Sequence, residues 1–353
     1  MRIEQIKEIA NAVLYEGYLL YPYRQSAIKN RTRWTFGVVY PREYSEENGG
    51  IDPWTMRTEC LVQGQVDNIV LDVTVRFLHL LTRTVVQPDL VEDNHIEANA
   101  NAWSLATRFA DEPLQEGIER EVSTLDIPLI ELMDHPKVVE IDSPGGRITN
   151  DKDTINRAFT TSAGQIVREQ QSIVGAVVLA AEAVGENIFK VSVQIENRSA
   201  VSSELTKRRD EVLFQSFIST HTILQVHEGS FISLLEAPEE LQTIVNGCQN
   251  IHTWPVLVGN EGERDAMLSS PIILYDYPQI APESPGSLFD GTEIDEILSL
   301  RIMTLTDEEK EQMRKDDRTR EILERTEALT PQQFMKLHGA IRELRPIREG
   351  EKE

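Results

Sequence analysis

Stretches that alternate apolar and polar residues constrain the fold of this chain more than any other feature of its sequence. The odd-numbered residues from Ile69 to Phe77 are all apolar, whereas Asp72 and Arg76 stand between them, and residues 189–196 alternate in the same way. A period of two places successive side chains on opposite faces of an extended strand, so both stretches predict strands with one buried and one wet face. His79 falls on the apolar face, where a core or interface histidine is a simpler interpretation than a ligand.

Strand patterns continue through residues 119–226. The apolar, β-branched run 173–184 leads into Gly185-Glu186-Asn187, a typical turn, and the chain then enters the alternating run that begins at Phe189. This order predicts a hairpin. Residues 217–226 alternate again, and a sandwich or an open antiparallel sheet is the economical interpretation. Nearer the N-terminus, residues 34–40 predict a short strand and residues 44–56 a loop.

The two ends of the chain carry helical patterns. Apolar residues recur every three or four positions in the first fifteen residues, as in an amphipathic helix. Thr306 with Glu309, and Thr330 followed by Pro331, are helix starts and predict helices over about 307–328 and 331–343. We therefore predict an α+β protein with an antiparallel β-rich, sandwich-like core, an N-terminal helix and a C-terminal helix pair. Three regions are expected: an N-terminal α+β region at 1–110, a β-rich domain at 111–300 and the C-terminal helices at 301–353.

The charge of the chain excludes some classes of partner. Its 353 residues hold 59 acids and 35 Lys plus Arg, a formal charge of -24. Such a field repels nucleic acid and anionic lipid. No run of 18 apolar residues predicts a membrane span, and the first residues do not form an export leader. The two cysteines, Cys60 and Cys248, are expected to be reduced thiols of a cytoplasmic protein.

The charge is distributed unevenly, in two segments that we name here. The basic stripe, residues 17–42, has no acid and a local charge of +5, and its expected partner-binding residues are Tyr21, Tyr23, Arg24, Lys29, Arg31, Arg33 and Trp34. The acidic segment, residues 227–300, has thirteen acids and one base. Its expected partner-binding residues are Glu263, Arg264, Asp265, Tyr275, Asp276, Tyr277, Asp290, Glu293 and Asp295. The sequence leaves open whether the two segments contact each other or separate partners.

The sequence offers little support for catalysis. GxGxxG, GxxxxGK[ST], HExxH, GxSxG and CxxC are all absent, and Ser269, Ser270, Asp265 and Asp276 have no triad spacing. A zinc or nickel site is the alternative, built from Cys248, His252 and one of His221 or His227. The two strand histidines cannot both join it, because six residues of strand separate them by about 20 Å.

Both charged segments also carry a family resemblance. YPYRQSAIKNRTRWTFGVVYP at 21–41, TWPVLVG at 253–259, GERDAMLSSPIILYDYPQIAPESPG at 262–286 and LFDGTEIDEILSLR at 288–301 are similar to an uncharacterised protein family associated with bacterial uptake [NiFe]-hydrogenase gene clusters. The resemblance implies a cytoplasmic accessory protein for maturation or assembly, with a hydrogenase subunit or maturation factor as partner. It supplies no catalytic residues and leaves open whether the protein handles nickel, holds a subunit or does something else; no cofactor is expected, with zinc or nickel as the alternative.

Three hypotheses follow. The first is a non-enzymatic assembly protein that binds a protein partner through a composite basic and acidic surface. The second is a metal-handling protein or metalloenzyme that uses the Cys248 site. The third is a structural component of a larger assembly, which a closed symmetric homo-oligomer would favour.

Overall fold

The computed structural model of the chain describes residues 6–11, 37–86, 114–155, 164–202 and 208–279, together with residues 307, 310, 314, 320, 323, 324 and 327. The chain divides into two compact units, residues 1–10 with 36–278 and residues 11–35 with 279–353. Every strand of the described residues belongs to the first unit. Strands on both sides of residue 110 pair within the same sheet, so residues 55–86 share one fold with the middle of the chain.

The described residues of the first unit form twelve strands and several short helices. The strands are β1 (Thr55–Gly64), β2 (Val70–Val86), β3 (Leu114–Pro128), β4 (Lys137–Ser143), β5 (Gly146–Ile155), β6 (Gly164–Gln170), β7 (Ile173–Gly185), β8 (Ile188–Asn197), β9 (Ile218–His227), β10 (Gly229–Ile232), β11 (Trp254–Leu257) and β12 (Ala266–Ser270). The α-helices are α3 (Arg42–Glu47), α5 (Leu129–Asp134), α6 (Arg209–Val212) and α7 (Gln242–Val245), and 3-10 turns cover Leu213–Gln215 and Glu239–Leu241.

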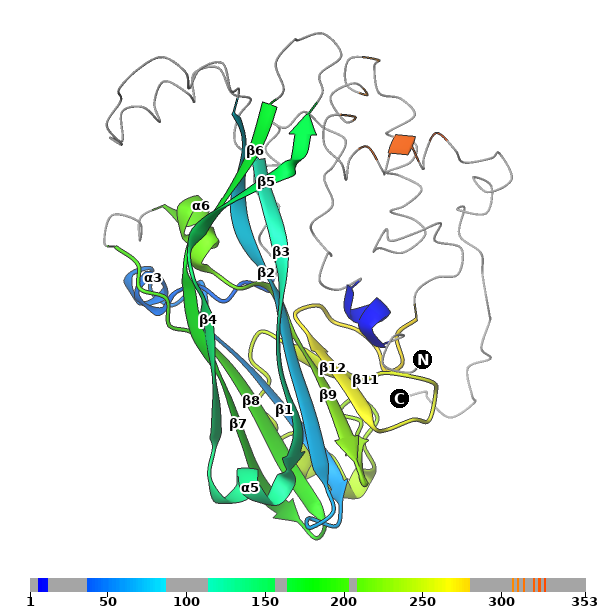
Figure 1. Ribbon diagram of the computed structural model, residues 1–353. Coiled ribbons are helices and arrows are strands. Elements are labelled where there is room, and N and C mark those ends of the chain that lie inside the picture. Colours follow the sequence, from blue (N-terminus) through cyan, green and yellow to red (C-terminus); the bar gives the residue numbers. More distant parts are fainter. Residues whose placement is uncertain are drawn as a thin grey trace. The chain divides into compact units, whose positions relative to one another are not determined.

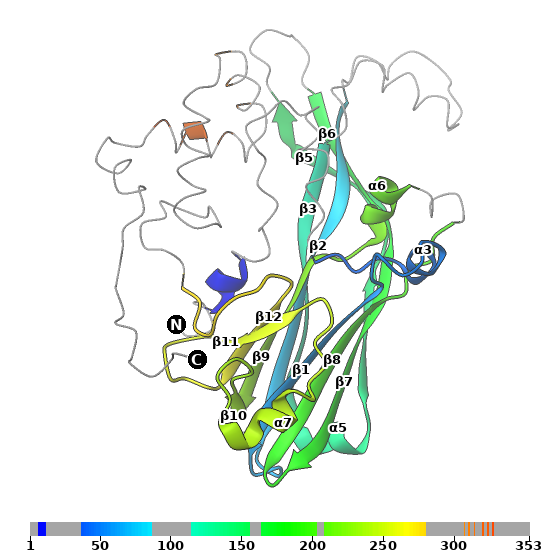
Figure 2. The same ribbon diagram turned by 180° about the vertical axis from the view of Figure 1, so that it is seen from behind.

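The strands form two antiparallel sheets, seen from opposite sides in Figure 1 and Figure 2. One sheet has five strands in the order β10-β1-β8-β7-β4. The other has seven, with β11-β12-β9-β2-β6-β5 in order and β3 on the remaining side of β2. The first part of β2 pairs with β9 and its last part with β6, while β3 follows most of its length. A single long strand therefore joins two regions of the larger sheet.

Beyond the sandwich, β2 and β3 continue together with β5 and β6 (Figure 1). The 17 residues of β2 span about 55 Å in extended form. Ion pairs support the long strands. Arg168 Nε of β6 lies 2.8 Å from Glu116 Oε2 of β3, across β2, and Arg76 Nη2 of β2 lies 3.3 Å from Glu119 Oε2 of the neighbouring β3.

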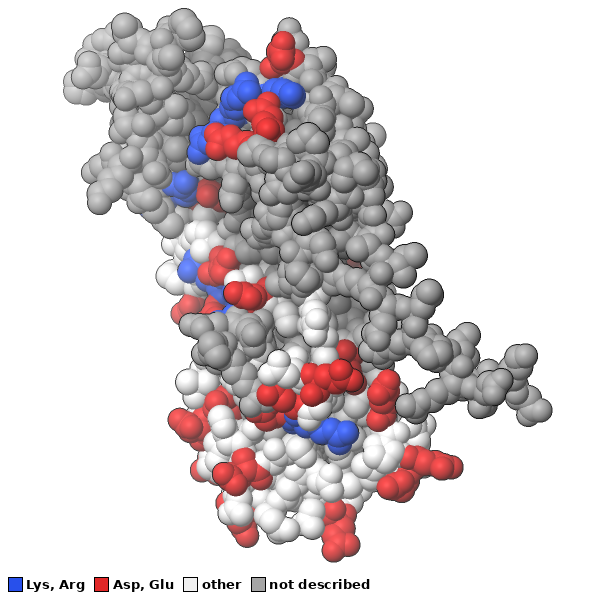
Figure 3. All heavy atoms as spheres, turned by 90° about the vertical axis from the view of Figure 1, so that its right-hand side faces the viewer, with Lys and Arg blue, Asp and Glu red and all other residues white. Residues whose placement is uncertain are grey.

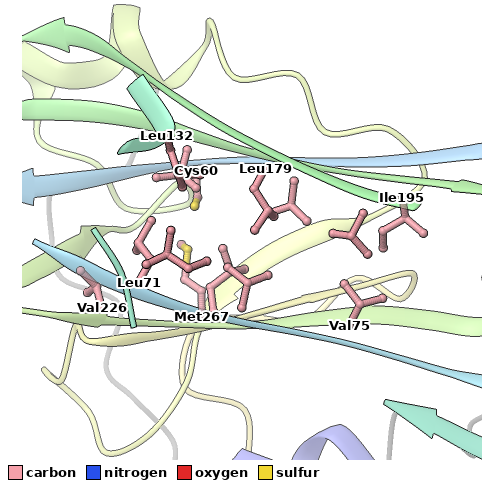
Figure 4. Packing of buried hydrophobic residues seen from close by; sticks show 14 of the residues in the cluster. Cys60, Leu71, Val75, Leu132, Leu179, Ile195, Val226 and Met267 are labelled. Carbon is pink, nitrogen blue, oxygen red and sulfur yellow. The ribbon is translucent and has the colours of Figure 1, made fainter. Parts of the chain in front are cut away.

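The main core lies between the two sheets, as a β-sandwich requires. Figure 4 shows Cys60, Leu179 and Ile195 of the smaller sheet facing Leu71, Val75, Val226 and Met267 of the larger one, with Leu132 of α5 at one end. The predicted alternation of β2 is confirmed on this inner face, because its odd-numbered residues from 71 to 77 all join the core. The prediction of a wet opposite face is wrong beyond Thr74, since Arg76, Leu78 and Leu80 are buried as well.

The predicted hairpin is confirmed as β7 and β8, joined by Glu186 and Asn187. Asn187 takes a φ of 55°, a left-handed conformation that Asn tolerates better than most residues. Near the start of β7, Gly175 allows β8 and Phe217 to approach the backbone closely. A Cβ atom at this position would lie 2.4 Å from the Glu196 carbonyl oxygen and 2.5 Å from Phe217 Cζ.

Residues 37–64 differ from the prediction. The expected loop at 44–56 begins inside α3 and ends inside β1, and residues 37–40 contribute only an isolated bridge between Val39 and Phe217. The pattern of β1 escapes sequence analysis because it buries polar residues on both faces, Thr58 towards the core and Glu59 away from it.

The fold is thus a β-rich α+β sandwich. At the N-terminus residues 6–11 are helical, with Ile6 and Ala10 buried and Glu8 exposed. In the tail, residues 307, 310, 320, 323, 324 and 327 are helical and residue 314 is in a turn. The rest of the predicted N-terminal helix and of the helix pair lies outside the described residues.

Candidate protein-interaction surface

The described part of the acidic segment, residues 227–279, contains β10, β11, β12 and the turns between them. It holds eight acids and a single base, Arg264. Five of the acids are exposed: Glu228, Glu236, Glu239, Glu240 and Glu261. Figure 3 faces the side of the sandwich that carries β11 and β12, and its lower part shows acidic and uncharged side chains with little blue. The described surface of residues 227–279 is therefore acidic.

Asp276 has both carboxylate oxygens engaged inside the protein. Its Oδ2 accepts a 2.6 Å hydrogen bond from the Ser233 hydroxyl, and its Oδ1 accepts one of 2.7 Å from the Leu257 backbone N–H. The Ser233 oxygen in turn accepts hydrogen bonds from the backbone N–H groups of Leu235 and Glu236. Asp276 thereby ties the segment after β12 to β11 and to the turn after β10.

Three other expected partner-binding residues also make internal contacts. Tyr277 donates from its hydroxyl to the Glu263 carbonyl at 2.9 Å and from its backbone to the Leu257 carbonyl at 2.7 Å. The Glu263 carboxylate accepts from the backbone and side chain of Asn260, which stabilises the turn between β11 and β12. The Asp265 carbonyl accepts from the Val226 N–H. These contacts position the surface, whereas Arg264 is itself exposed.

Large exposed apolar side chains concentrate in the same segment. Ten such residues occur among the described part of the chain, and five of them lie here: Leu235, Ile251, Trp254, Ile273 and Tyr275. Ile273 is 75% exposed and Tyr275 is 86% exposed. Tyr275 is an expected partner-binding residue. Trp254 and Ile273 were missed because sequence patterns do not separate an exposed apolar residue from a buried one in a short irregular segment.

The path of the backbone places these side chains along one strand. Ser270, the last residue of β12, pairs with Trp254, the first of β11, and the Tyr277 N–H bonds to Leu257 at the end of β11. Residues 271–276 therefore pass alongside β11. Ile273 and Tyr275 are exposed whereas Leu274 is only partly exposed, so the two exposed side chains share the solvent side of this segment.

The other expected partner-binding residues lie outside the described residues. They are Tyr21, Tyr23, Arg24, Lys29, Arg31, Arg33 and Trp34 of the basic stripe, and Asp290, Glu293 and Asp295 of the acidic segment. Arg42, the last base of the stripe, is described. It is exposed in α3, lies 2.6 Å from Glu46 Oε1, and stacks over the Trp54 ring at 4.8 Å.

The predicted metal ligands occupy separate environments. His221 is buried in β9, where Nδ1 lies 2.9 Å from the Ser219 carbonyl, and burial lowers its pKa to about 4. His252 is exposed in a loop, and His227 lies 2.9 Å from Asp72. Across the ranges that the structure describes, no group of three or more His, Cys, Asp or Glu could hold a metal ion. Cys248, His252 and either histidine of β9 thus do not meet as a site.

Cys248 is half-buried beside a buried carboxylate. Glu59 is 1% exposed, and its oxygens lie 2.6 Å from Arg57 Nη2 and 3.7 Å from Lys190 Nζ. It also accepts a 2.7 Å hydrogen bond from the Gln249 N–H. Burial and then the charge of Glu59 raise the pKa of the Cys248 thiol to about 11. The thiol is therefore protonated at neutral pH, which makes it a poor nucleophile.

Sequence analysis missed one further cluster, which joins α3 to α6. Tyr40 and Tyr44 stack with ring centroids 5.1 Å apart, and Arg209 lies over the Tyr40 ring at 5.5 Å. Asp52 accepts from the Tyr44 hydroxyl at 2.9 Å and pairs with Arg209 at 3.2 Å. Burial, and next the hydrogen bond to Asp52, raise the pKa of Tyr44 to about 12. These contacts hold two chain segments together, although the buried Tyr40 hydroxyl has no hydrogen-bond partner among the described residues.

Ser269 belongs to a buried chain of hydroxyls. Its Oγ lies 2.7 Å from both Thr58 Oγ1 and Thr253 Oγ1. Its described hydrogen bonds link β12 to β1 across the two sheets and involve no histidine or carboxylate. This arrangement is structural and does not resemble a hydrolytic triad.

No protein-family model matches this chain, and no curated protein matches it either. None of the described helices combines the length and the apolar character that crossing a membrane requires. The surface that β10 to β12 carry has exposed apolar side chains in an acid-rich setting, and these are the features of the described residues best suited to binding another protein.

Proposed function

We propose that this chain is a non-enzymatic accessory protein of the cytoplasm that binds a protein partner. One observation carries the proposal: half of the large exposed apolar side chains of the described residues lie in the acidic segment, which also holds five exposed acids. Isolated exposed apolar residues are common in proteins. An apolar centre of aromatic and aliphatic side chains with polar residues at its edge is typical of interfaces.

The resemblance supplies the proposed setting, maturation or assembly of a [NiFe]-hydrogenase. In this setting the acidic segment forms one half of a composite surface and the basic stripe the other half. The partner would be a hydrogenase subunit or another maturation factor. A closed homo-oligomer remains compatible with this role.

The proposal is tested by purifying the native chain from cells that express a [NiFe]-hydrogenase and identifying the proteins that accompany it. We expect a hydrogenase subunit or maturation factor in near-stoichiometric amount. The triple substitution Arg24→Ala, Arg31→Ala, Arg33→Ala should abolish its capture, while Arg147→Ala, which removes an exposed base far from the stripe in sequence, should leave it intact. Absence of any hydrogenase-related protein would contradict the proposal.

Metal handling stays a prediction of the sequence that no described geometry favours. Its test is separate. Elemental analysis of the purified chain after incubation with zinc or nickel would show a bound ion, and substitution of Cys248 and His252 would remove it.

A further inference from the structure

The acidic segment carries exposed apolar side chains on a stretch of backbone that hydrogen bonds hold in place. Ile273 and Tyr275 are almost fully solvated, yet the residues that follow them are tied down by Asp276 and Tyr277. Four hydrogen bonds hold these two residues to Ser233, Leu257 and Glu263. A segment restrained in this way loses little conformational freedom on binding, which is the usual requirement for an anchor.

Leu235 and Trp254 border the same segment. Leu235 is joined to it through Ser233, which accepts from the Leu235 N–H and donates to Asp276. Trp254 begins β11, alongside which residues 271–276 pass. The backbones of four exposed apolar residues, from three separate parts of the sequence, are thus linked to one restrained segment.

The charges around these anchors specify the partner. Glu236 directly follows Leu235, and Glu239 and Glu240 lie in the next turn, all three exposed. Residues 227–279 contain one base against eight acids, so a neutral or acidic partner would meet uncompensated repulsion or desolvation. A partner with basic side chains around an apolar centre satisfies both features of the surface.

Resting on the proposed function, we infer that this surface docks a cationic segment of a partner protein, with large apolar side chains of that segment packing on Ile273, Tyr275 and Trp254. Leu235 and the acids at 236, 239 and 240 form the rim. Charge then sets the rate of association and the choice of partner, and the apolar side chains set the lifetime of the complex.

The probe is a synthetic peptide that alternates Lys with Leu and Trp, with two reference peptides. In one reference Ser replaces Leu and Trp, and in the other Glu replaces Lys. Fluorescence anisotropy with the full chain should show binding of the first peptide, at least about tenfold weaker binding of the Ser peptide, and none of the Glu peptide. Equal binding of the Lys peptides with and without apolar residues would overturn the inference, because charge alone would then explain it.

Matched variants locate the site. Ile273→Ser with Tyr275→Ser should weaken binding about tenfold or more, whereas Ile51→Ser, which changes an apolar side chain that is 85% exposed outside the segment, should not. Glu236→Lys with Glu239→Lys and Glu240→Lys should also weaken binding, whereas Glu131→Lys with Asp134→Lys and Glu186→Lys, which reverses three exposed acids outside the segment, should not. Circular dichroism confirms that each variant is folded. Equal effects of the paired variants would overturn the inference.

The same variants separate this inference from the proposed function. If the native hydrogenase-related partner is captured equally well by wild type and by the Ile273→Ser, Tyr275→Ser variant, the proposed function holds and the inference fails. If no such partner is captured at all, the proposed function fails. Sedimentation of the chain alone tests a second copy as occupant, since a dimer that this variant dissociates would overturn the assignment to a cationic partner.

Discussion

Glu59 shows how one buried charge can organise its surroundings. Its carboxylate contacts Arg57, Lys190 and the Gln249 N–H, and the Asn250 side chain bonds to both the N–H and the carbonyl of Glu59. These contacts hold residues 249–251 along the part of β1 that β10 does not cover. A buried carboxylate is stable only when it is paired in this way.

Replacement of Glu59 tests that role. Glu59→Gln keeps the shape of the side chain but removes its charge from between Arg57 and Lys190, and we expect the free energy of unfolding to fall by about 2–4 kcal/mol. The control is Glu182→Gln, because Glu182 also pairs with Lys190 at 2.6 Å but is 61% exposed. That change should alter stability by less than about 1 kcal/mol. Urea titration measures both, and equal losses would contradict this account.

His79 introduces a pH dependence. Burial, assisted by Arg120, lowers its pKa to about 4 from the ordinary 6.5. The unfolded chain therefore binds a proton below pH 6.5 that the folded chain excludes, so the stabilising contribution is complete above pH 6.5 and declines as the pH falls towards 4. Between pH 6.5 and 5 the loss is about 2 kcal/mol for this residue.

Urea unfolding at both pH values measures the loss, and His79→Leu should reduce the pH dependence by that amount. An unchanged dependence in the variant would show that His79 does not exclude a proton in the folded state. Neither ring nitrogen of His79 has a hydrogen-bond partner among the described residues. The backbone of Gln171 and of Phe214 acts to raise the pKa of His79, but the effect of burial is larger.

At the scale of elements, the packing of β7 against β8 depends on the missing side chain of Gly175. Gly175→Ala would place a Cβ against the Glu196 carbonyl and the Phe217 ring, so we expect a loss of about 1–3 kcal/mol. Gly146→Ala in β5 is the matched control, because nothing lies within 4 Å of its Cβ position. Thermal unfolding should separate the two variants, and similar melting temperatures would contradict the packing of this strand pair.

Strands with a regular alternation were predictable, whereas β1 was not. β8 and the inner face of β2 follow a period of two, so their positions could be read from the sequence. β1 could not, because Glu59 occupies a buried outer position, where Arg57, Lys190 and the Gln249 N–H compensate its charge. The anchoring of Asp276 was equally hidden, since its partner Ser233 is 43 residues away in sequence.

At the scale of the whole molecule, the formal charge of -24 opposes folding through self-repulsion. Raising the salt concentration from about 0.01 M to about 0.1 M shortens the screening length from about 30 Å to about 10 Å. We expect the melting temperature to rise over this range, because screening relieves more repulsion than it removes attraction from exposed ion pairs. Differential scanning calorimetry with sodium chloride measures the shift, and a fall would show that the ion pairs dominate.

The sequence by itself determined that the chain is acidic, β-rich and antiparallel, and that its charge is concentrated in two segments, because composition and period-two alternation are local properties. Only the tertiary structure decided that the alternating strands close into a two-sheet sandwich and that Ile273 and Tyr275 remain in solvent. It also decided that Asp276 and Tyr277 support this surface from within. Exposure and hydrogen bonding depend on residues that are distant in sequence, and a local pattern carries no information about which of them will meet.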